Sequence, residues 1–323
     1  MTGASNVVGE PSKAAAEGYR SITFESGAPH EKYFGWTELV VEPGLKIIAR
    51  QRGPVRRCLI LAQGIQFTRL DETVRHLRLM DARTDLVLHD FDDPGRSERV
   101  VANQVWRRIP ESERLLNKAT FVFDLARDDE AIIKSMDPNY RRDLRKAREA
   151  GLRVEADNRP APETFQEFTS SFEAMVRGRG LRSPGRLVLR RMFDGGDLTL
   201  FRVLAGNVAR ASAAVYRAND KAIWIIGVDG GKAKDGAGRI LQFEIMRRLR
   251  SQNVRWYDLG GVASTDEGDG IYKFKKGFGG AFVSLGAEYF RRPPLVRALV
   301  RIRRSARDAA RLWRRAGSRT ALS

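Results

Sequence analysis

The chain has 323 residues, of which 42% are hydrophobic and 30% are charged, and it carries a formal net charge of +18. This length and apolar content allow two modest globular lobes and exclude a disordered protein, and no run approaches the ~18 consecutive apolar residues of a membrane-spanning helix. Of its 58 basic residues, 46 are arginine and 12 are lysine, which favours phosphate-bearing partners because a guanidinium group pairs with phosphate oxygens in a bidentate way.

Residues 1–30 are small, polar and rich in Gly, Ser and Ala. They lack the charged start and apolar middle of a signal peptide, so they predict a flexible tail. The single cysteine, Cys58, excludes a disulfide framework and favours a cytoplasmic protein. Alternating or continuous apolar runs then predict strands over 36–43, 45–50, 55–62 and 85–89, with an amphipathic helix marked by Leu70, Val74, Leu77 and Met80. We expect these elements to form a mixed α/β first lobe over residues 31–127.

Residues 128–150 have a helical pattern that is interrupted at Asp137-Pro138. Proline at the first helical position predicts that a second helix starts there. The pattern beyond predicts a strand at 152–155, helices at 163–177 and 185–193, strands at 198–204, 209–217 and 222–228, a helix at 239–250, and strands at 254–259 and 281–288. Strands that alternate with helices favour an α/β or α+β core, which we expect over residues 128–290.

The richest segment lies near the end of this second lobe. Residues 256–261 read Trp-Tyr-Asp-Leu-Gly-Gly, and residues 269–280 read Asp-Gly-Ile-Tyr-Lys-Phe-Lys-Lys-Gly-Phe-Gly-Gly. The strand brings Asp258 to its C-terminal end, where ligands tend to bind open α/β sheets. The loop that follows places Lys273, Lys275 and Lys276 among aromatic residues, a surface suited to phosphates and stacked bases. An ordinary basic loop between strands is the alternative interpretation.

This segment resembles the signature of the Fem family, transferases that add amino acids from aminoacyl-tRNA to peptidoglycan precursors. The departures from the family pattern are Leu259 for Phe, Ile271 for Leu and Lys273 for Arg. Further stretches that fit the family lie at residues 121–125, 136–147, 151–154 and 241–244. The resemblance covers roughly residues 115–288, and the first lobe only in outline. It implies an α/β (α+β) fold of tandem GNAT-like lobes, each built like the acyl-CoA-dependent N-acetyltransferases, with a substrate cleft between them.

The resemblance also implies an activity, the transfer of an amino acid from aminoacyl-tRNA to an amine of a peptidoglycan precursor or related nucleotide- or lipid-linked acceptor. The ester of the donor is already activated, so the enzyme must position the amine and stabilise the oxyanion. Lys275 is the candidate for that stabilisation, and Asp258 or Asp90 for accepting the amine proton, although Asp258 fits a structural cap of the strand end equally well. The candidate substrate-binding residues are Arg141, Arg145 and Lys146 for an acceptor diphosphate, Lys273 and Lys276 for tRNA phosphates, and Tyr257, Tyr272 and Phe274. We expect a monomer with no bound cofactor.

Two other functions remain open. Gly236-Ala237-Gly238 precedes a helix, and an acyl-CoA pyrophosphate can bind such a Gly-x-Gly turn, which makes Gly236 and Gly238 the candidate cofactor-binding residues of an acyl-CoA-dependent N-acyltransferase. A loop followed by a helix start is the plainer interpretation of this turn. Charge alone favours a non-catalytic protein that binds tRNA or a membrane. No metal site is expected, because the three histidines are not spaced as metal ligands.

The last predicted element is a basic amphipathic helix over residues 291–323. Residues 291–319 contain eleven arginines and one acid, Asp308, and so supply +10. The apolar residues recur every three to four positions, at Leu295, Leu299, Ile302, Ala306, Ala310 and Trp313. Such helices lie in the headgroup layer of anionic membranes, so we expect peripheral contact with the inner face of the membrane. A helix packed on the body of the protein and contact with tRNA are the alternatives.

Overall fold

A computed structural model describes residues 19–25, 28–93, 97–179, 184–229, 235–299 and 302. These residues fall into two compact units. The larger unit contains the described residues up to Phe34 together with Leu116–Leu285, and the smaller unit contains Gly35–Leu115 and the described residues from Gly286 onward. Each unit has one mixed sheet of seven strands among the described residues, so the predicted α/β class is confirmed.

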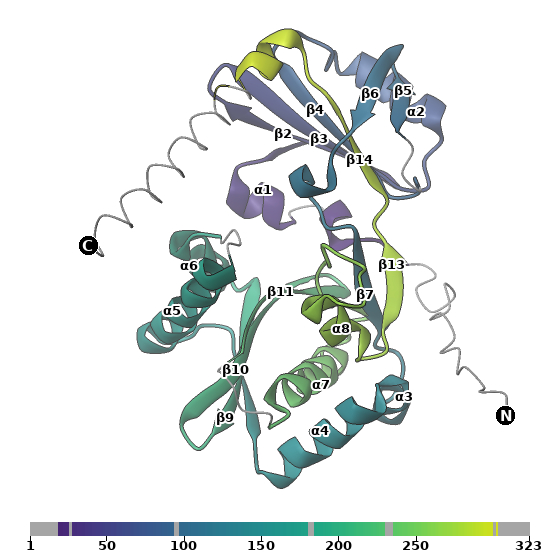
Figure 1. Cartoon of the computed structure of the whole chain (residues 1–323). Coiled ribbons are helices and arrows are strands. Elements are labelled where there is room, and N and C mark those ends of the chain that lie inside the picture. The colour runs from purple at the N-terminus through teal and green to yellow at the C-terminus, as the bar shows by residue number, and fades with distance from the viewer. Residues whose placement is uncertain are drawn as a thin grey trace, which may run out of the picture. The chain divides into compact units, whose positions relative to one another are not determined.

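The smaller unit is built on a sheet with the strand order β1-β2-β3-β4-β14-β6-β5 (Figure 1). Its elements are β1 (Thr37–Glu42), β2 (Leu45–Arg52), β3 (Val55–Ala62), α2 (Phe67–His76), β4 (Thr84–Asp90), β5 (Glu98–Val101), β6 (Gln104–Arg108), the 3₁₀ turn η3 (Glu111–Glu113) and β14 (Ala287–Arg291). Strands β3 and β4 are parallel and are joined through α2, whose Leu70 and Val74 pack into the buried cluster on one face of the sheet.

The larger unit is built on a sheet with the strand order β13-β7-β12-β11-β10-β9-β8. Its elements are η2 (Ile22–Phe24), α1 (Pro29–Phe34), β7 (Ala119–Asp124), α3 (Asp129–Ser135), α4 (Pro138–Glu149), β8 (Arg153–Asp157), α5 (Pro162–Arg179), α6 (Arg186–Asp194), β9 (Leu198–Ala205), β10 (Val208–Ala218), β11 (Lys221–Asp229), α7 (Ala237–Ser251), β12 (Trp256–Asp258), α8 (Gly270–Lys276) and β13 (Ala281–Ser284). Strands β11 and β12 are parallel and are joined through α7, the same arrangement as β3-α2-β4.

Helices cover both faces of this larger sheet (Figure 1). On one face, α3, α4, α7 and α8 bury a cluster that includes Phe121, Phe243 and Phe278. On the other face, α5 and α6 bury a second cluster that includes Phe168 and Phe193. The sheet therefore has a hydrophobic core on each side, and the ends of β11 and β12 lie between them.

Each sheet contains one strand from a distant part of the chain. In the smaller unit, β14 pairs with β4 and β6, although it follows the whole larger unit in sequence. In the larger unit, β7 pairs with β12 and β13. The division between the units at Leu115 and Leu116 therefore differs from the expected boundary at 127/128, because hydrogen bonding places β7 in the second sheet.

Several predictions need correction. The flexible tail expected over 1–30 does not extend to Tyr19, Ile22, Phe24 and Ala28, which are buried, and residues 1–18 lie outside the described residues. The strand predicted over 281–288 is two strands in different sheets, since Gly286 turns the chain with φ +69° and a Cβ there would lie 1.9 Å from the Asp90 carbonyl oxygen.

The hairpin of β5 and β6 was not predicted. Its two turn residues, Ala102 and Asn103, have φ values of +49° and +59°. Turns with two positive φ values usually have the sequence Asn-Gly or Asp-Gly. The turn here has Ala-Asn instead. The predicted break at Asp137-Pro138 is confirmed, because α3 ends before it and Pro138 opens α4.

Candidate functional site

The turn that follows β12 is held by residues from three distant parts of the chain. Asp258 at the strand end is buried, and its carboxylate accepts hydrogen bonds from the Tyr19 hydroxyl (2.6 Å), the Gly260 amide (2.8 Å) and the Thr120 hydroxyl. Burial raises the pKa of Asp258, and these donors oppose the rise. Gly260 has φ +72°, and a Cβ at this position would lie 2.4 Å from the Trp224 carbonyl oxygen. The geometry therefore gives Asp258 a clear role as the cap that fixes this turn.

Lys275 lies directly against the same turn. Its Nζ donates to the carbonyl oxygens of Gly260 (2.8 Å) and Gly261 (3.0 Å), and only 7% of the residue is exposed. Burial lowers the pKa of Lys275 to about 8, against the opposing effect of Asp258 and Asp269. An ammonium group has three N–H donors, so one remains without a partner among the described residues. Lys275 can offer that donor to a ligand.

The segment around Lys275 is a helix, α8, and not the predicted basic loop. Asp269 caps the helix, because its carboxylate accepts hydrogen bonds from the amides of Ile271 and Tyr272, both at 2.8 Å. The helix separates the three lysines: Lys275 is buried, whereas Lys273 and Lys276 are exposed. Lys276 forms an ion pair with Glu267. Only one of the three can therefore take part in chemistry that excludes water.

A pocket of about 760 Å³ opens beside Lys275, within the larger unit. This volume lies in the range of roughly 300–1,000 Å³ that is typical of small-molecule sites. Four elements supply most of the lining: α5, the strand β11, the start of α7, and α8. The lining residues are Phe172, Met175, Val176, Pro184, Ala211, Ser212, Trp224, Ile225, Ile226, Gly227, Val228, Gly238, Arg239, Gln242, Gly261, Asp269, Gly270, Ile271, Phe274 and Lys275.

Trp224 forms part of the wall of the pocket next to Lys275. The Lys275 Nζ lies 5.2 Å from the centre of the Trp224 ring, and the indole N–H donates to the Ile226 carbonyl oxygen at 2.6 Å. A Cβ on Gly227 would lie 2.1 Å from the same ring, so only glycine lets the indole lie on the strand. The strand register shifts at this point, where β11 gains Ile225 opposite β10. Bulges of this kind often re-aim side chains beside active sites.

The start of α7 forms another part of the pocket wall, but the two candidate glycines differ in role. Gly236 has φ +78°, and a Cβ there would lie 2.3 Å from the Asp143 carbonyl oxygen, so packing against α4 already requires glycine. Gly238 does line the pocket. The Asp235 carboxylate accepts the Ala237 amide at 3.1 Å and pairs with Arg210. An acid in this place disfavours a pyrophosphate at the helix start.

Gln242 and Arg239, one turn apart on α7, are pocket residues that sequence reasoning did not assign. The Gln242 Oε1 accepts a hydrogen bond from the buried Tyr257 hydroxyl at 2.7 Å, which leaves its amide nitrogen as a donor. Tyr257, expected to bind substrate, is fully buried and instead orients Gln242. The Arg239 guanidinium lies 4.7 Å and 5.3 Å from the ring centres of Tyr140 and Phe274. No local pattern distinguishes these two residues from other polar residues of a helix.

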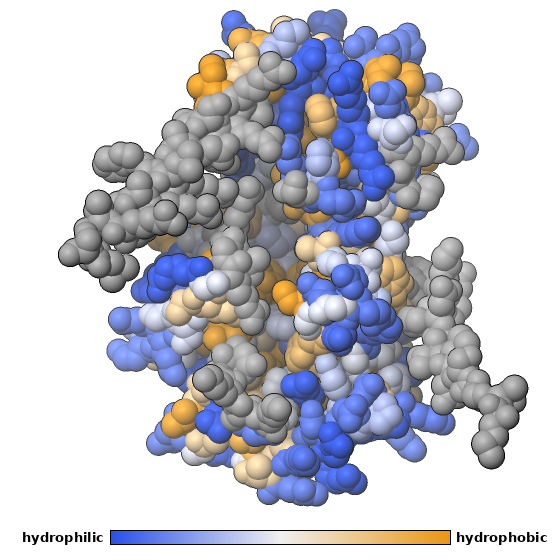
Figure 2. Space-filling model, viewed as in Figure 1, coloured by the Kyte–Doolittle hydropathy of each residue, from blue (hydrophilic) through white to orange (hydrophobic). Residues whose placement is uncertain are grey.

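The remaining predicted residues lie outside this pocket. Arg141, Arg145 and Lys146 are exposed on α4 and form no ion pair among the described residues, in a region where hydrophilic surface gathers (Figure 2). The Tyr140 hydroxyl joins α4 to α8 by donating to the Phe274 carbonyl oxygen at 3.1 Å. These cations therefore belong to the same unit as Lys273. Tyr272 packs on Phe121, with ring centres 5.6 Å apart.

Asp90 lies in the smaller unit, at the end of β4, where it pairs with Arg99. Burial raises the pKa of Asp90, and the Arg99 charge opposes the rise. It stands at the end of its parallel strand as Asp258 does in the larger unit, and like Asp258 it accepts the amide two residues on, here that of Asp92 at 3.1 Å. Its proposed part in the reaction stays a prediction.

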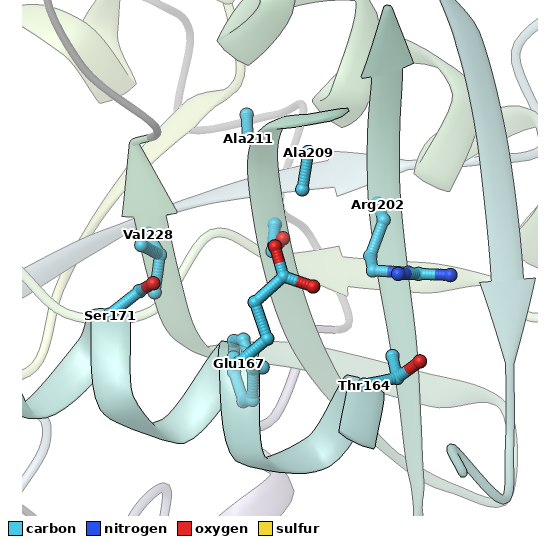
Figure 3. A pocket seen from close by; sticks show the side chains of 9 residues that line it. Thr164, Glu167, Ser171, Arg202, Ala209, Ala211 and Val228 are labelled. Carbon is cyan, nitrogen blue, oxygen red and sulfur yellow. The ribbon is translucent and has the colours of Figure 1, made fainter. Parts of the chain in front are cut away.

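A second, much smaller pocket lies between α5 and the strands β9 and β10 (Figure 3). Its volume of about 40 Å³ has room for only a few water molecules. The Arg202 guanidinium beside it is already paired with Glu155 at 3.3 Å. This pocket is too small for a substrate.

The described residues contain no group of histidine, cysteine or acidic side chains that could hold a metal ion. In the part of the chain that the structure describes, no helix is both long and apolar enough to cross a bilayer.

Comparison with known proteins identifies the fold. The model of the acetyltransferase (GNAT) domain family matches residues 134–276. Three similar solved structures are FemX (TM-score 0.62, 14% identity, 81% of this chain and 90% of that chain), the C-terminal domain of a putative lysylphosphatidylglycerol synthetase from Agrobacterium fabrum (0.52, 12%, 85% and 89%) and L-PGS from Bacillus licheniformis (0.50, 12%, 89% and 94%). No curated protein matches the chain. The protein therefore has a GNAT fold, and the site lies in the matched region.

Proposed function

We propose that the protein is an aminoacyltransferase that moves an amino acid from aminoacyl-tRNA to an amine of a peptidoglycan precursor or a related small acceptor. The observation that carries this proposal is Lys275, a buried ammonium group in the wall of a substrate-sized pocket, with one N–H that has no partner among the described residues. The similarity of the fold to FemX supports the aminoacyl donor, as does the signature at 256–280.

The proposed reaction joins the acceptor amine to the ester carbon of the donor. The amine nitrogen attacks this carbon, and the carbonyl oxygen becomes an oxyanion that accepts the third N–H of Lys275. The C–O bond to the ribose then breaks, the amide C–N bond remains, and the proton lost by the amine passes to the ribose oxygen. Donors that meet an oxyanion in a water-poor site typically contribute ~3–4 kcal/mol. Gln242 supplies a second donor, because Tyr257 holds its Oε1.

Asp258 has a positioning role in this proposal. Its three hydrogen bonds hold the Gly260 turn, and the turn presents the two carbonyl oxygens that hold Lys275. Asp90 remains the candidate base from the sequence. The acceptor class also remains a proposal, and a lipid-linked acceptor is included because one neighbour of similar fold is named a putative lysylphosphatidylglycerol synthetase.

Acyl-CoA is the alternative donor, favoured by the match to the acetyltransferase family and by Gly238 in the pocket wall. Asp235 argues against it, because its carboxylate occupies the amide of Ala237 where a pyrophosphate would bind. A purely tRNA- or membrane-binding protein would have no need for a buried lysine in a pocket.

One experiment separates these donors. The purified protein is mixed with radiolabelled aminoacyl-tRNAs and a panel of amine acceptors, including nucleotide-linked and lipid-linked precursors, and labelled product is counted. We expect transfer that RNase abolishes. Equal or better transfer from acetyl-CoA, unaffected by RNase, would contradict the proposal in favour of the acyl-CoA alternative.

A further inference from the structure

The pocket beside Lys275 has two chemically different ends. In the part of the chain that the structure describes, the charged side chains of the lining come from the start of α7 and from α8 with its cap: Arg239, Asp269 and Lys275. The helix α5 supplies only apolar ones, Phe172, Met175 and Val176, and faces Ile226 of β11. A ligand that fills both ends needs a polar head and an apolar body.

Asp269 is the only acid among the described residues that line this pocket. Its Oδ1 accepts both amide hydrogen bonds that cap α8, and its Oδ2 has no partner among the described residues. It stands close enough to Lys275 to act on the charge of that residue. A cationic group that enters beside Lys275 and Arg239 would be repelled by both, so it needs this carboxylate. The α-ammonium group of an aminoacyl ester, two bonds from the reacting carbonyl carbon, is such a group.

The apolar end continues into the core of the larger unit. Phe172, Val176 and Ile226 are 6%, 8% and 3% exposed and belong to the hydrophobic cluster on the α5 face of the sheet. A charged side chain placed there would lose its water without gaining a partner. A donor side chain as small as the methyl group of alanine would leave these residues without contacts on one side. A bulky apolar side chain satisfies both conditions.

We propose that this pocket selects donors whose amino acid has a bulky apolar side chain, with the α-ammonium group held by Asp269 and the side chain held between α5 and β11. This inference rests on the proposed aminoacyl donor. The inference names the class of amino acid that the donor carries. It also assigns Asp269 and Met175 as the residues that determine this selectivity.

The test measures binding of non-hydrolysable donors to the full chain. The probes are phenylalanyl-, leucyl-, alanyl- and lysyl-3′-amino-3′-deoxyadenosine, in which an amide replaces the ester, and the readout is isothermal calorimetry. We expect the phenylalanyl and leucyl probes to bind at least ~10-fold more tightly than the alanyl and lysyl probes, since each methylene group in an apolar pocket is worth roughly 10-fold or more. N-acetylation of the phenylalanyl probe removes its charge and should weaken binding by ~10-fold.

Two variants locate the contacts. Met175→Trp fills the apolar end, so the preference for phenylalanyl over alanyl should vanish, whereas Ala174→Trp adds the same bulk at an exposed position of α5 and should keep it. Asp269→Asn retains an N-cap but should bind the free and N-acetylated probes equally. Thermal unfolding confirms that each variant is folded.

The outcomes are distinguishable. Binding of all the adenosine probes with no preference for bulky apolar side chains overturns this inference and leaves the proposed donor intact. An unchanged preference in Met175→Trp also overturns it. Binding of acetyl-CoA but of none of the adenosine probes overturns the proposed donor and this inference together.

Discussion

The ammonium group of Lys275 is subject to two opposed effects. Removal from water disfavours its charge, whereas the carbonyl oxygens of Gly260 and Gly261 and the nearby carboxylates favour it. The result is a pKa of about 8, below the usual 10.5 of lysine. Between these two values the unfolded chain binds more protons than the folded one. The free energy of unfolding therefore gains a contribution that rises from about pH 8 to 10.5.

This pKa predicts how turnover depends on pH. If the charged form stabilises the oxyanion, turnover falls as the pH rises through about 8, because Lys275 then loses its proton. Lys275→Ala should lower turnover by roughly 100-fold or more while tRNA affinity changes little. Lys275→Arg keeps a positive charge at all these pH values, so any activity that remains should not decrease as the pH rises. Steady-state kinetics across pH 6–10 provides the measurement.

Lys273→Ala is the matched control, because Lys273 lies on the same helix but is exposed. Its expected contact is with a tRNA phosphate and not with the reacting carbonyl group, so at saturating tRNA it should keep the turnover and the pH profile of the natural chain. Turnover that keeps rising above pH 8 in the natural chain, or a nearly normal rate in Lys275→Ala, would contradict the assigned role.

At the scale of residues, the sequence pointed to Lys275 and Asp258 but not to the surroundings that define their roles. The partners of Asp258 lie at positions 19, 120 and 260, and Tyr19 stands at the end of a segment that reads as a flexible tail. Trp224 and Arg239 become pocket residues only through the pairing of β11 and the packing of α7. No spacing in the sequence encodes such long-range contacts.

At the scale of elements, α4 and α8 form one exposed basic surface of the larger unit. The amide of Asp137, just before α4, donates to the Gly277 carbonyl oxygen at 2.8 Å, and a Cβ on Gly277 would lie 2.4 Å from the Tyr140 ring. Packing this close explains why position 277 of the family-like motif is glycine. It also means that the exposed cations of both helices can meet one polyanion.

This surface predicts a salt-dependent contact with tRNA. Lys273→Ala and Lys276→Ala, which remove the cations expected to hold tRNA phosphates, should each weaken tRNA binding several-fold and reduce the slope of log affinity against log salt by roughly 0.7–0.9, the loss of one phosphate contact. Filter binding at several salt concentrations measures both values. Arg191→Ala is the matched control, because Arg191 is exposed on α6, which covers the opposite face of the sheet. An equal change in all three variants would contradict a localised tRNA surface.

Helices and strands were predicted well where the hydrophobic periodicity is strong. They were predicted poorly where a single residue determines the start or the end of an element. The break between α3 and α4 and the three strands β9, β10 and β11 follow the sequence pattern closely. The helix α8 was not predicted because a segment of only seven residues shows little periodicity. Only the cap at Asp269 indicates where the helix starts. The division of 281–288 into two strands depends on Gly286 alone.

At the scale of the whole chain, the basic segment after β14 provides a further prediction. Residues 294–299 are helical, and Val296 is buried, whereas residues 303–323 lie outside the described part of the chain. Strand β14 ends at Arg291, so a truncation that tests this segment must leave the chain intact beyond that residue. A chain that ends at Leu299 removes most of the arginines and keeps the strand.

We expect the full chain to co-sediment with anionic lipid vesicles at low salt and the chain shortened to Leu299 to remain in the supernatant. Neutral vesicles and high salt should release the full chain, because the contact is largely electrostatic. Sedimentation of both chains to the same extent would contradict a membrane role for the tail.

Strand β14 completes the smaller sheet although it follows the whole larger unit in sequence. This position determines the order in which the two sheets are completed during synthesis. The ribosome releases β4 and β6 early, but the strand that fills the space between them arrives only at residues 287–291. Until then, the nascent smaller sheet keeps two open inner edges, which invite pairing with other chains. In the larger sheet, the last strand to be translated is β13, which lies at the edge and leaves no gap between other strands. The unit whose strands are mostly translated first is therefore the one that finishes folding last.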